Sequence, residues 1–254
     1  HLVRNPFEMA VSNYHYHAQV PSPEAWIHHQ NPCDIEYHQD GITDNFADMV
    51  VPTLTKMGYS SMNVSFGEPL FAMEDFHNIQ NDCLSLYQTR EGLQEATLLG
   101  HLMNYDAPEG LRLATAEMTI QGFNNGGDIL RMANNIVKLR QAQARVTEGP
   151  RYKKDRKELR IYTMSLDDFI AQPAQSAYRF FDFVMGARAS QMQKEAVANQ
   201  YEEYYRSKEI KSRHVTHGRS HNTEELKEYL RHDPVYGPPL TKIERLVETA
   251  LATD

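Results

Sequence analysis

Residues 2–17 read LVRNPFEMAVSNYHYH, and this stretch predicts the fold because it joins a strand directly to a helix. Its first two residues are apolar, whereas Asn5 is a favourable N-cap and Pro6 suits the first position of a helix. Glu8 follows the cap residue by three positions, which is the spacing of a capping box. We therefore expect a strand that ends before the cap and a helix from about Pro6 to Ala18.

A second strand is expected from Leu159 to Met164, where apolar and polar residues alternate weakly. Ser165 then caps an acidic turn, and Pro173 opens an amphipathic helix that runs to about Phe183. The order of strand, turn and helix thus occurs twice. Because helices between strands imply crossover connections and a parallel sheet, the sequence predicts an α/β fold, a three-layer domain with a parallel central sheet.

The chain between the two predicted strands is expected to be helical or irregular. Residues 19–70 read as a long, partly irregular insertion that prolines interrupt. From residue 82 to about 145, apolar residues recur at helical spacing, with breaks near 106–108 and 124–127. These segments predict helix-rich insertions in the domain.

Composition and charge limit the partners. The 254 residues are 41% apolar and 24% charged, as in an ordinary globular protein, and they include no run long enough to span a bilayer. The net charge of −8 repels polyanions, so nucleic acid is not an expected partner. An anionic ligand must therefore be held by a local site.

Cysteine and histidine patterns give no metal site. Cys33 and Cys83 are too few for a disulfide framework and lack CxxC spacing, although one bridge between them remains open. His15 and His17 lie two residues apart, and such residues do not share a helix face. The nearby carboxylates show no ligand spacing such as HExxH, so we expect no metal.

One anion site is expected at the first strand end. Arg4 stands there beside a helix N-terminus, whose N–H groups and positive dipole end favour an anion, and a bidentate arginine suits phosphate. Ser12 follows eight residues later on the same helix and has a hydroxyl to donate. The alternatives are that Arg4 is a structural ion-pair partner and that Ser12 bonds back to its own helix.

These residues resemble the 3′-phosphate-binding motif of sulfotransferases, in which a strand ending in Arg-Asn-Pro leads into a helix with a serine at this spacing, followed by aromatic residues and histidines. The resemblance implies the P-loop-like sulfotransferase fold. By it, Arg4 and Ser12 would bind the 3′-phosphate of the donor 3′-phosphoadenosine 5′-phosphosulfate (PAPS) or of the product adenosine 3′,5′-bisphosphate. His15 and His17 are the candidates for the catalytic proton acceptor.

Two later stretches resemble the same family. Residues 159–186 look like the strand, acidic turn and helix that cover the adenosine. Residues 217–221, HGRSH, look like the Lys-Gly-Arg loop that closes over the nucleotide, and helices are expected after it at 223–230 and 240–251. The loop residues implied to contact the nucleotide are His217, Gly218 and Arg219.

The chain also departs from the family pattern. The 5′-phosphosulfate loop, rich in Gly, Ser, Thr and Lys, and the usual general base lie upstream of Arg-Asn-Pro in the family, and neither is found here. Leu166 stands where many cytosolic members have an adenine-contacting tyrosine, and His217 replaces the loop lysine. The resemblance therefore implies a single sulfotransferase-like domain over residues 1–254 that lacks its N-terminal strand, loop and helix.

The function that the resemblance implies is transfer of a sulfuryl group from PAPS to a hydroxyl or amine of a small-molecule or carbohydrate acceptor. Two alternatives stay open, namely a catalytically inactive sulfotransferase-like scaffold or assembly subunit and a relative of the P-loop kinases. A homodimer and the identity of the acceptor also stay open. The compartment is either the cytoplasm, which the Arg-Asn-Pro segment favours, or the Golgi lumen, which the glycosylation sequon at 63–65 favours.

Overall fold

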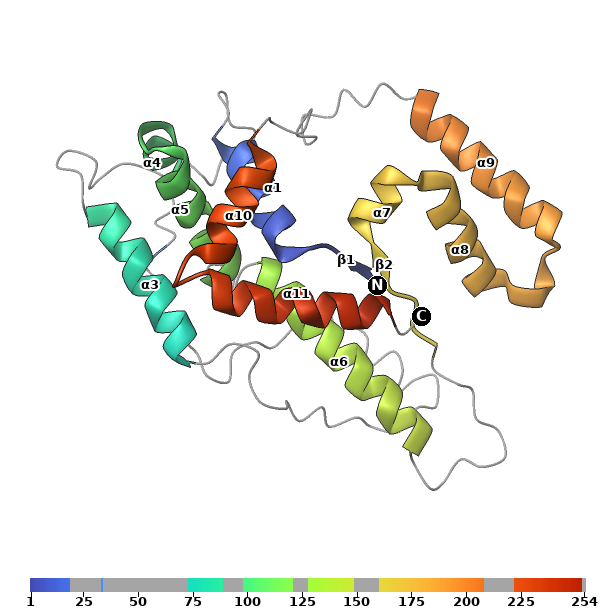
Figure 1. The fold of residues 1–254 in the computed structure, drawn as a ribbon. Helices are drawn as coiled ribbons and strands as arrows, with labels where there is room; N and C mark the ends of the chain where they lie inside the picture. Colours follow the sequence, from blue (N-terminus) through green and yellow to red (C-terminus); the bar gives the residue numbers. More distant parts are fainter. Residues whose placement is uncertain are drawn as a thin grey trace.

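The computed structural model describes residues 1–18, 33, 73–88, 98–120, 128–148, 160–207 and 222–252 (Figure 1). Helix accounts for 83% of it, and its sheet consists of two short strands, β1 (Leu2–Val3) and β2 (Met164–Ser165). The prediction of a three-layer α/β domain with a parallel central sheet is therefore wrong. The prediction fails because the described core consists of apolar helix faces that pack against one another, and not of a sheet covered by helices on both sides.

The two strands nevertheless pair as the sequence indicated. They run parallel, with Leu2 opposite Met164 and Val3 opposite Ser165. The second strand is shorter than expected, since residues 160–163 have no regular structure. The pairing brings the start of the chain beside a segment more than 160 residues away.

The described helices account for nearly all of the remaining structure. In chain order they are α1 (Pro6–His17), α3 (Met73–Gln88), α4 (Leu98–Asn104), α5 (Ala107–Ile120), α6 (Asp128–Glu148), α7 (Leu166–Ala171), α8 (Pro173–Met185), the 3₁₀ helix η2 (Gly186–Arg188), α9 (Gln191–Ser207), α10 (Thr223–His232) and α11 (Gly237–Leu251).

The predicted start of α1 is confirmed. The side-chain oxygen of Asn5 accepts hydrogen bonds from the backbone N–H groups of Phe7 at 2.9 Å and of Glu8 at 3.3 Å. The carboxylate of Glu8, expected to close a capping box, pairs with Lys227 of α10. The cap therefore fixes where the helix begins, and the acidic residue of its first turn joins it to a distant helix.

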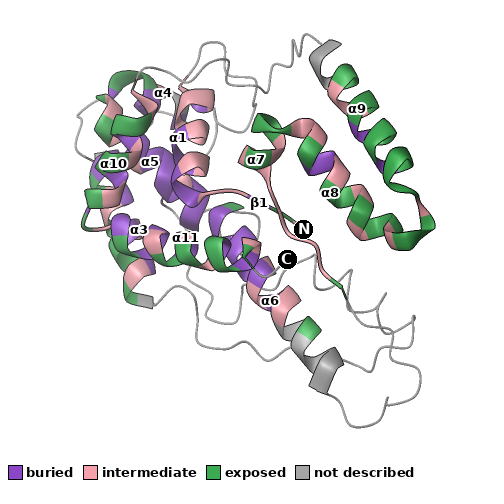
Figure 2. Ribbon diagram, turned by 45° about the vertical axis from the view of Figure 1, so that its right-hand side comes forward, coloured by how far each residue is buried: buried purple, intermediate pink, exposed green. Residues whose placement is uncertain are grey.

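The core lies where α1 and α5 cross, with α3, α6, α10 and α11 around them (Figure 2). The helix α5 is buried on most of its surface, and α1 buries Phe7, Ala10 and Val11 completely or nearly so. The ring of Tyr14 lies so close to α5 that a Cβ at Gly110 would be 2.8 Å from it. Small residues in α5 thus let α1 approach closely.

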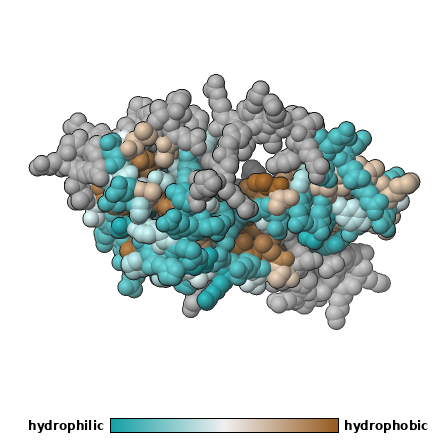
Figure 3. Space-filling view, turned by 45° about the horizontal axis from the view of Figure 1, so that its top comes forward, coloured by the Kyte–Doolittle hydropathy of each residue, from teal (hydrophilic) through white to brown (hydrophobic). Residues whose placement is uncertain are grey.

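The helices α7, α8 and α9 lie to one side of this core (Figure 1). α8 and α9 pack along each other, and Lys194 of α9 forms an ion pair with Asp182 of α8 at 2.6 Å. On the face seen in Figure 3, brown apolar atoms gather near the middle of the molecule, while most of the remaining coloured surface is hydrophilic. The large apolar residues that α8 and α9 leave exposed are Phe180, Val184, Met185, Met192, Val197 and Tyr204.

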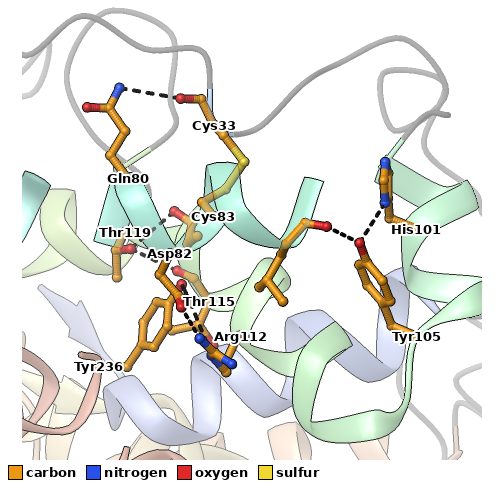
Figure 4. The surroundings of a disulfide bond; sticks show 12 residues. Cys33, Gln80, Asp82, Cys83, His101, Tyr105, Arg112, Thr115, Thr119 and Tyr236 are labelled. Atoms are coloured by element: carbon orange, nitrogen blue, oxygen red, sulfur yellow. Dashed lines mark hydrogen bonds and ion pairs between the residues drawn. A yellow bond between two sulfur atoms is a disulfide. The ribbon is translucent and has the colours of Figure 1, made fainter. Parts of the chain in front are cut away.

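A disulfide joins Cys33 to Cys83 of α3 (Figure 4). Both sulfur-bearing residues are fully buried, and the side chain of Gln80 donates a hydrogen bond to the carbonyl oxygen of Cys33 at 3.4 Å. The bridge that the sequence left open is thus formed in the structure. It fixes residue 33 against α3 within the buried core.

We predict that Gly237→Ala destabilises the protein by about 1–3 kcal/mol, as forced overpacking does. A Cβ at this position would lie 2.4 Å from the backbone carbonyl oxygen of Arg231, so α10 and α11 would have to separate. Urea denaturation measures the effect. Lys242→Ala, which places alanine at an exposed position of the same helix, is the control, and equal stability of the two variants would contradict the packing argument.

We also predict that Cys83→Ser lowers the free energy of unfolding by roughly 2–4 kcal/mol, because the bridge closes a loop across a sequence separation of 50 residues. Denaturation with and without a reductant measures this loss. The reductant should destabilise the natural protein and leave the variant unchanged. A natural protein that the reductant does not destabilise would contradict the prediction.

Candidate functional site

A cavity of about 460 Å³ lies where β1, α1, α5, α6 and α7 meet. It contains both residues that the sequence predicted as phosphate ligands, Arg4 and Ser12. The residues that line it are Leu2, Val3, Arg4, Met9, Ser12, Asn13, Tyr16, Met118, Asp128, Met132 and Leu166.

Helix geometry explains which residues of α1 reach the cavity. Met9, Ser12, Asn13 and Tyr16 stand at positions i, i+3, i+4 and i+7, which share one helix face. Arg4 precedes the helix at the end of β1, and its backbone N–H contacts the sulfur of Met132 at 3.2 Å. One wall of the cavity is therefore set by the strand end and by a single helix face.

The guanidinium of Arg4 is held by Asp167 of α7. Its Nε donates to the carboxylate Oδ1 at 2.9 Å, and the two side chains are 24% and 37% exposed. Ser165 positions this carboxylate, because it ends β2 and its hydroxyl caps α7 by accepting from the N–H of Asp168. Arg4 is therefore an ion-pair partner, as one of the two alternatives held, and it forms this pair through Nε. No described residue forms a hydrogen bond with its two Nη groups.

The hydroxyl of Ser12 makes no hydrogen bond within the part of the chain that the structure describes, which includes all of α1. The Ser12 hydroxyl therefore does not form a hydrogen bond with its own helix, which was the alternative. The residue is partly exposed and stands on the cavity wall, so its hydroxyl is available to a ligand.

The two histidine candidates do not line the cavity. His17 is buried, with its ring edge-on to Tyr16 at 4.9 Å between centroids. The ring of His15 is tilted against Tyr14 at 5.5 Å, and burial lowers the pKa of this histidine. Their role as proton acceptors stays a prediction that the cavity does not support.

The loop residues His217, Gly218 and Arg219 lie outside the described residues, and their contact with a nucleotide stays a prediction. The helices expected after this loop are confirmed as α10 and α11, although both are longer than predicted. Leu166, which the resemblance to sulfotransferases compares with an adenine-contacting tyrosine, lines the cavity together with Arg4.

Sequence reasoning missed three polar residues near Ser12, namely Asn13, Glu117 and Asp128. The amide nitrogen of Asn13 donates to the backbone oxygen of Ala114 at 3.3 Å and to the carboxylate of Glu117 at 2.9 Å. Asp128, at the start of α6, also lines the cavity and pairs loosely with Arg131 at 3.5 Å. The position of Asn13 beside Ser12 was the available signal, whereas its partners come from a helix a hundred residues away.

The carboxyl group of Glu117 is unusual. Burial raises its pKa to about 7, and the negative charge of Asp128 adds to this effect, while the hydrogen bond from Asn13 and the positive charge of Arg131 oppose it. The group therefore changes charge near neutral pH, immediately behind the cavity wall.

The cavity lining combines hydrogen-bond donors with acceptors. Donors come from Arg4 and Ser12, and acceptor oxygens come from Asn13 of α1 and from Asp128 of α6. Among the described residues, no cluster of His, Cys, Asp and Glu side chains is placed to hold a metal ion. None of the described helices combines the length and the apolar character needed to cross a membrane.

Comparison with known protein families, with curated proteins and with solved structures found no match. The resemblance to sulfotransferases therefore rests on the residues of the chain, above all on the segment from Arg4 to Ser12.

We predict that stability falls as the pH rises from about 4.5 to 7 through the titration of Glu117. In this range the folded protein keeps the proton that the unfolded chain, with the ordinary pKa of 4.5, has already released. The contribution is on the order of 3 kcal/mol if the shift is fully realised. Glu117→Gln keeps an acceptor for Asn13 and should remove this loss.

Denaturation of the natural protein and of Glu117→Gln between pH 4.5 and 8 measures the difference. The variant should be the more stable of the two at pH 8. Glu225→Gln, which changes an exposed carboxylate of α10, should follow the natural protein. Parallel pH curves for the natural protein and Glu117→Gln would contradict the assignment.

Proposed function

We propose that this protein is a sulfotransferase and that the cavity binds the 3′-phosphate of PAPS. The acceptor would be a hydroxyl or amine of a small molecule or carbohydrate. The observation that carries the proposal is that Arg4 and Ser12, eight residues apart in the sequence, line one cavity at the point where a strand passes into a helix. This is the arrangement that the sequence motif implies.

The chemistry of Arg4 fits a phosphate. Asp167 engages Nε at 2.9 Å, which orients the guanidinium while leaving both Nη groups for two parallel bonds to phosphate oxygens. The carboxylates that oppose a phosphate here are Asp167, which pairs with Nε, and Asp128, which lines the same cavity. The same ion pair therefore serves to position Arg4 when the cavity is empty and when a ligand is present.

The helix N-terminus contributes less than the sequence suggested. The side chain of Asn5 already accepts from the N–H groups of Phe7 and Glu8, so these donors are not available to an anion. The positive end of the helix dipole remains. Recognition of the phosphate would thus depend on Arg4 and Ser12 more than on backbone N–H groups.

The size of the cavity agrees with such a ligand. Small-molecule sites occupy roughly 300–1,000 Å³, and this one has about 460 Å³. The apolar residues on its walls, including Leu2, Met132 and Leu166, suit the carbon framework of a nucleoside.

In the proposed reaction a base takes the acceptor proton and the acceptor oxygen or nitrogen attacks sulfur. The bond from sulfur to the 5′-phosphate oxygen breaks, and adenosine 3′,5′-bisphosphate leaves. The described residues supply the handle that holds the nucleotide. We assign no described residue to the attack itself.

Calorimetric titration with adenosine 3′,5′-bisphosphate tests the nucleotide site. We predict that Arg4→Ala weakens binding about 10- to 100-fold, since a hydrogen bond to a charged group contributes about 1.5–3 kcal/mol. Adenosine 5′-monophosphate should bind weakly to the natural protein. Arg245→Ala, an exposed arginine of α11 away from the cavity, is the matched control and should bind normally.

Absence of binding by a folded protein would overturn the proposal. Binding that Arg4→Ala leaves unchanged would move the nucleotide to another site. Tight binding without sulfuryl transfer to any of a panel of hydroxyl and amine acceptors would favour the inactive scaffold.

A further inference from the structure

Asn13 is fixed in one orientation on the cavity wall. Its amide nitrogen has two hydrogens, and these are directed at the oxygen of Ala114 and the carboxylate of Glu117, at 3.3 and 2.9 Å. The backbone oxygen of Ala114 can only accept, so exchanging the nitrogen and oxygen of this amide would set two oxygens against each other and lose that hydrogen bond. The group that remains for a ligand is the carbonyl oxygen Oδ1, which only accepts.

This acceptor stands next to the donors of the anion site. Ser12 and Asn13 are consecutive residues of α1, and although consecutive side chains of a helix diverge, both of these line the cavity with Arg4. A phosphate held by Arg4 and Ser12 therefore has a hydrogen-bond acceptor at its side. A ligand that matches this pattern carries a hydroxyl on the carbon adjacent to the one that bears the phosphate.

We propose that Asn13 is a specificity-determining residue that accepts a hydrogen bond from the hydroxyl group next to the bound phosphate. This inference rests on the proposed function. For a nucleoside 3′-phosphate, the hydroxyl in question is the 2′-hydroxyl of the ribose. The protein should therefore distinguish ribonucleotides from their 2′-deoxy counterparts.

Glu117 acts in this proposal as a positioning residue. It does not line the cavity, and it reaches the ligand only through the amide of Asn13. A glutamine at this position still offers an acceptor oxygen, whereas a leucine does not. Without that acceptor the amide can rotate and present its NH₂ group, which cannot accept from a hydroxyl.

Asp128 of α6 is the other acceptor that lines the cavity. Its carboxylate is largely exposed and has a partner of its own in Arg131 at 3.5 Å. Comparing variants of Asn13 and of Asp128 therefore separates the two acceptors.

The experiment is calorimetric titration of the full chain with adenosine 3′,5′-bisphosphate and with its 2′-deoxy analogue. We predict that the natural protein binds the deoxy analogue about 5- to 10-fold more weakly, in the range expected for one neutral hydrogen bond. Asn13→Ala and Glu117→Leu should bind the two ligands equally. Glu117→Gln, which keeps an acceptor for Asn13, and Asp128→Ala, which removes the other acceptor, should keep the preference for the ribonucleotide.

The outcomes distinguish this inference from the proposed function. Failure of both ligands to bind would overturn the nucleotide site and this inference with it. Equal affinity of the natural protein for the two ligands would overturn the inference and leave the nucleotide site intact, even if a variant failed to fold. If Asn13→Ala still prefers the ribonucleotide over the 2′-deoxy analogue, another residue accepts the hydrogen bond from the hydroxyl group, and the inference is wrong.

Discussion

The side chain of Asn5 joins the start of α1 to the last two helices, and the arrangement of the core depends on this junction. Its oxygen caps α1, while its nitrogen donates to Glu244 of α11 at 2.7 Å. Arg231 of α10 binds the same carboxylate through two nitrogens, at 2.6 and 3.0 Å. Its guanidinium also lies 4.3 Å from the centre of the Phe7 ring. Three helices therefore meet at one hydrogen-bonded group.

Electrostatics make this junction robust at neutral pH. The bidentate bond from Arg231, with a further contribution from Asn5, lowers the pKa of Glu244. The carboxylate therefore stays charged to a lower pH than an ordinary glutamate and accepts from both partners at neutral pH. Arg4 directly precedes Asn5 in the sequence. The hydrogen bonds of Asn5 that join the helices therefore also fix the position of Arg4, the residue proposed to bind phosphate, at the end of β1.

Local signals in the sequence predicted local structure well. The cap at Asn5, the proline at the first position of α1, the cap at Ser165 and the helix that begins at Pro173 are all found, since each depends on residues within one turn. The predicted central sheet failed because the pattern of strand, turn and helix says nothing about how many strands pair. In the described residues, two-residue strands suffice and helix faces supply the core.

The site was predicted in part for the same reason. Arg4 and Ser12 belong to one short segment, so their spacing could be interpreted from the sequence. Asp167 and Glu117 reach the cavity region through pairings across more than a hundred residues. No periodicity or motif connects such residues, and tertiary packing alone decides that they meet.

The disulfide has a topological consequence. By joining Cys33 to Cys83, it turns the chain between them into a closed covalent ring that carries most of α3. A break in any one peptide bond of that ring opens the circle but does not divide the molecule. The two pieces of the protein would remain one covalent species until the sulfur bridge itself was cut.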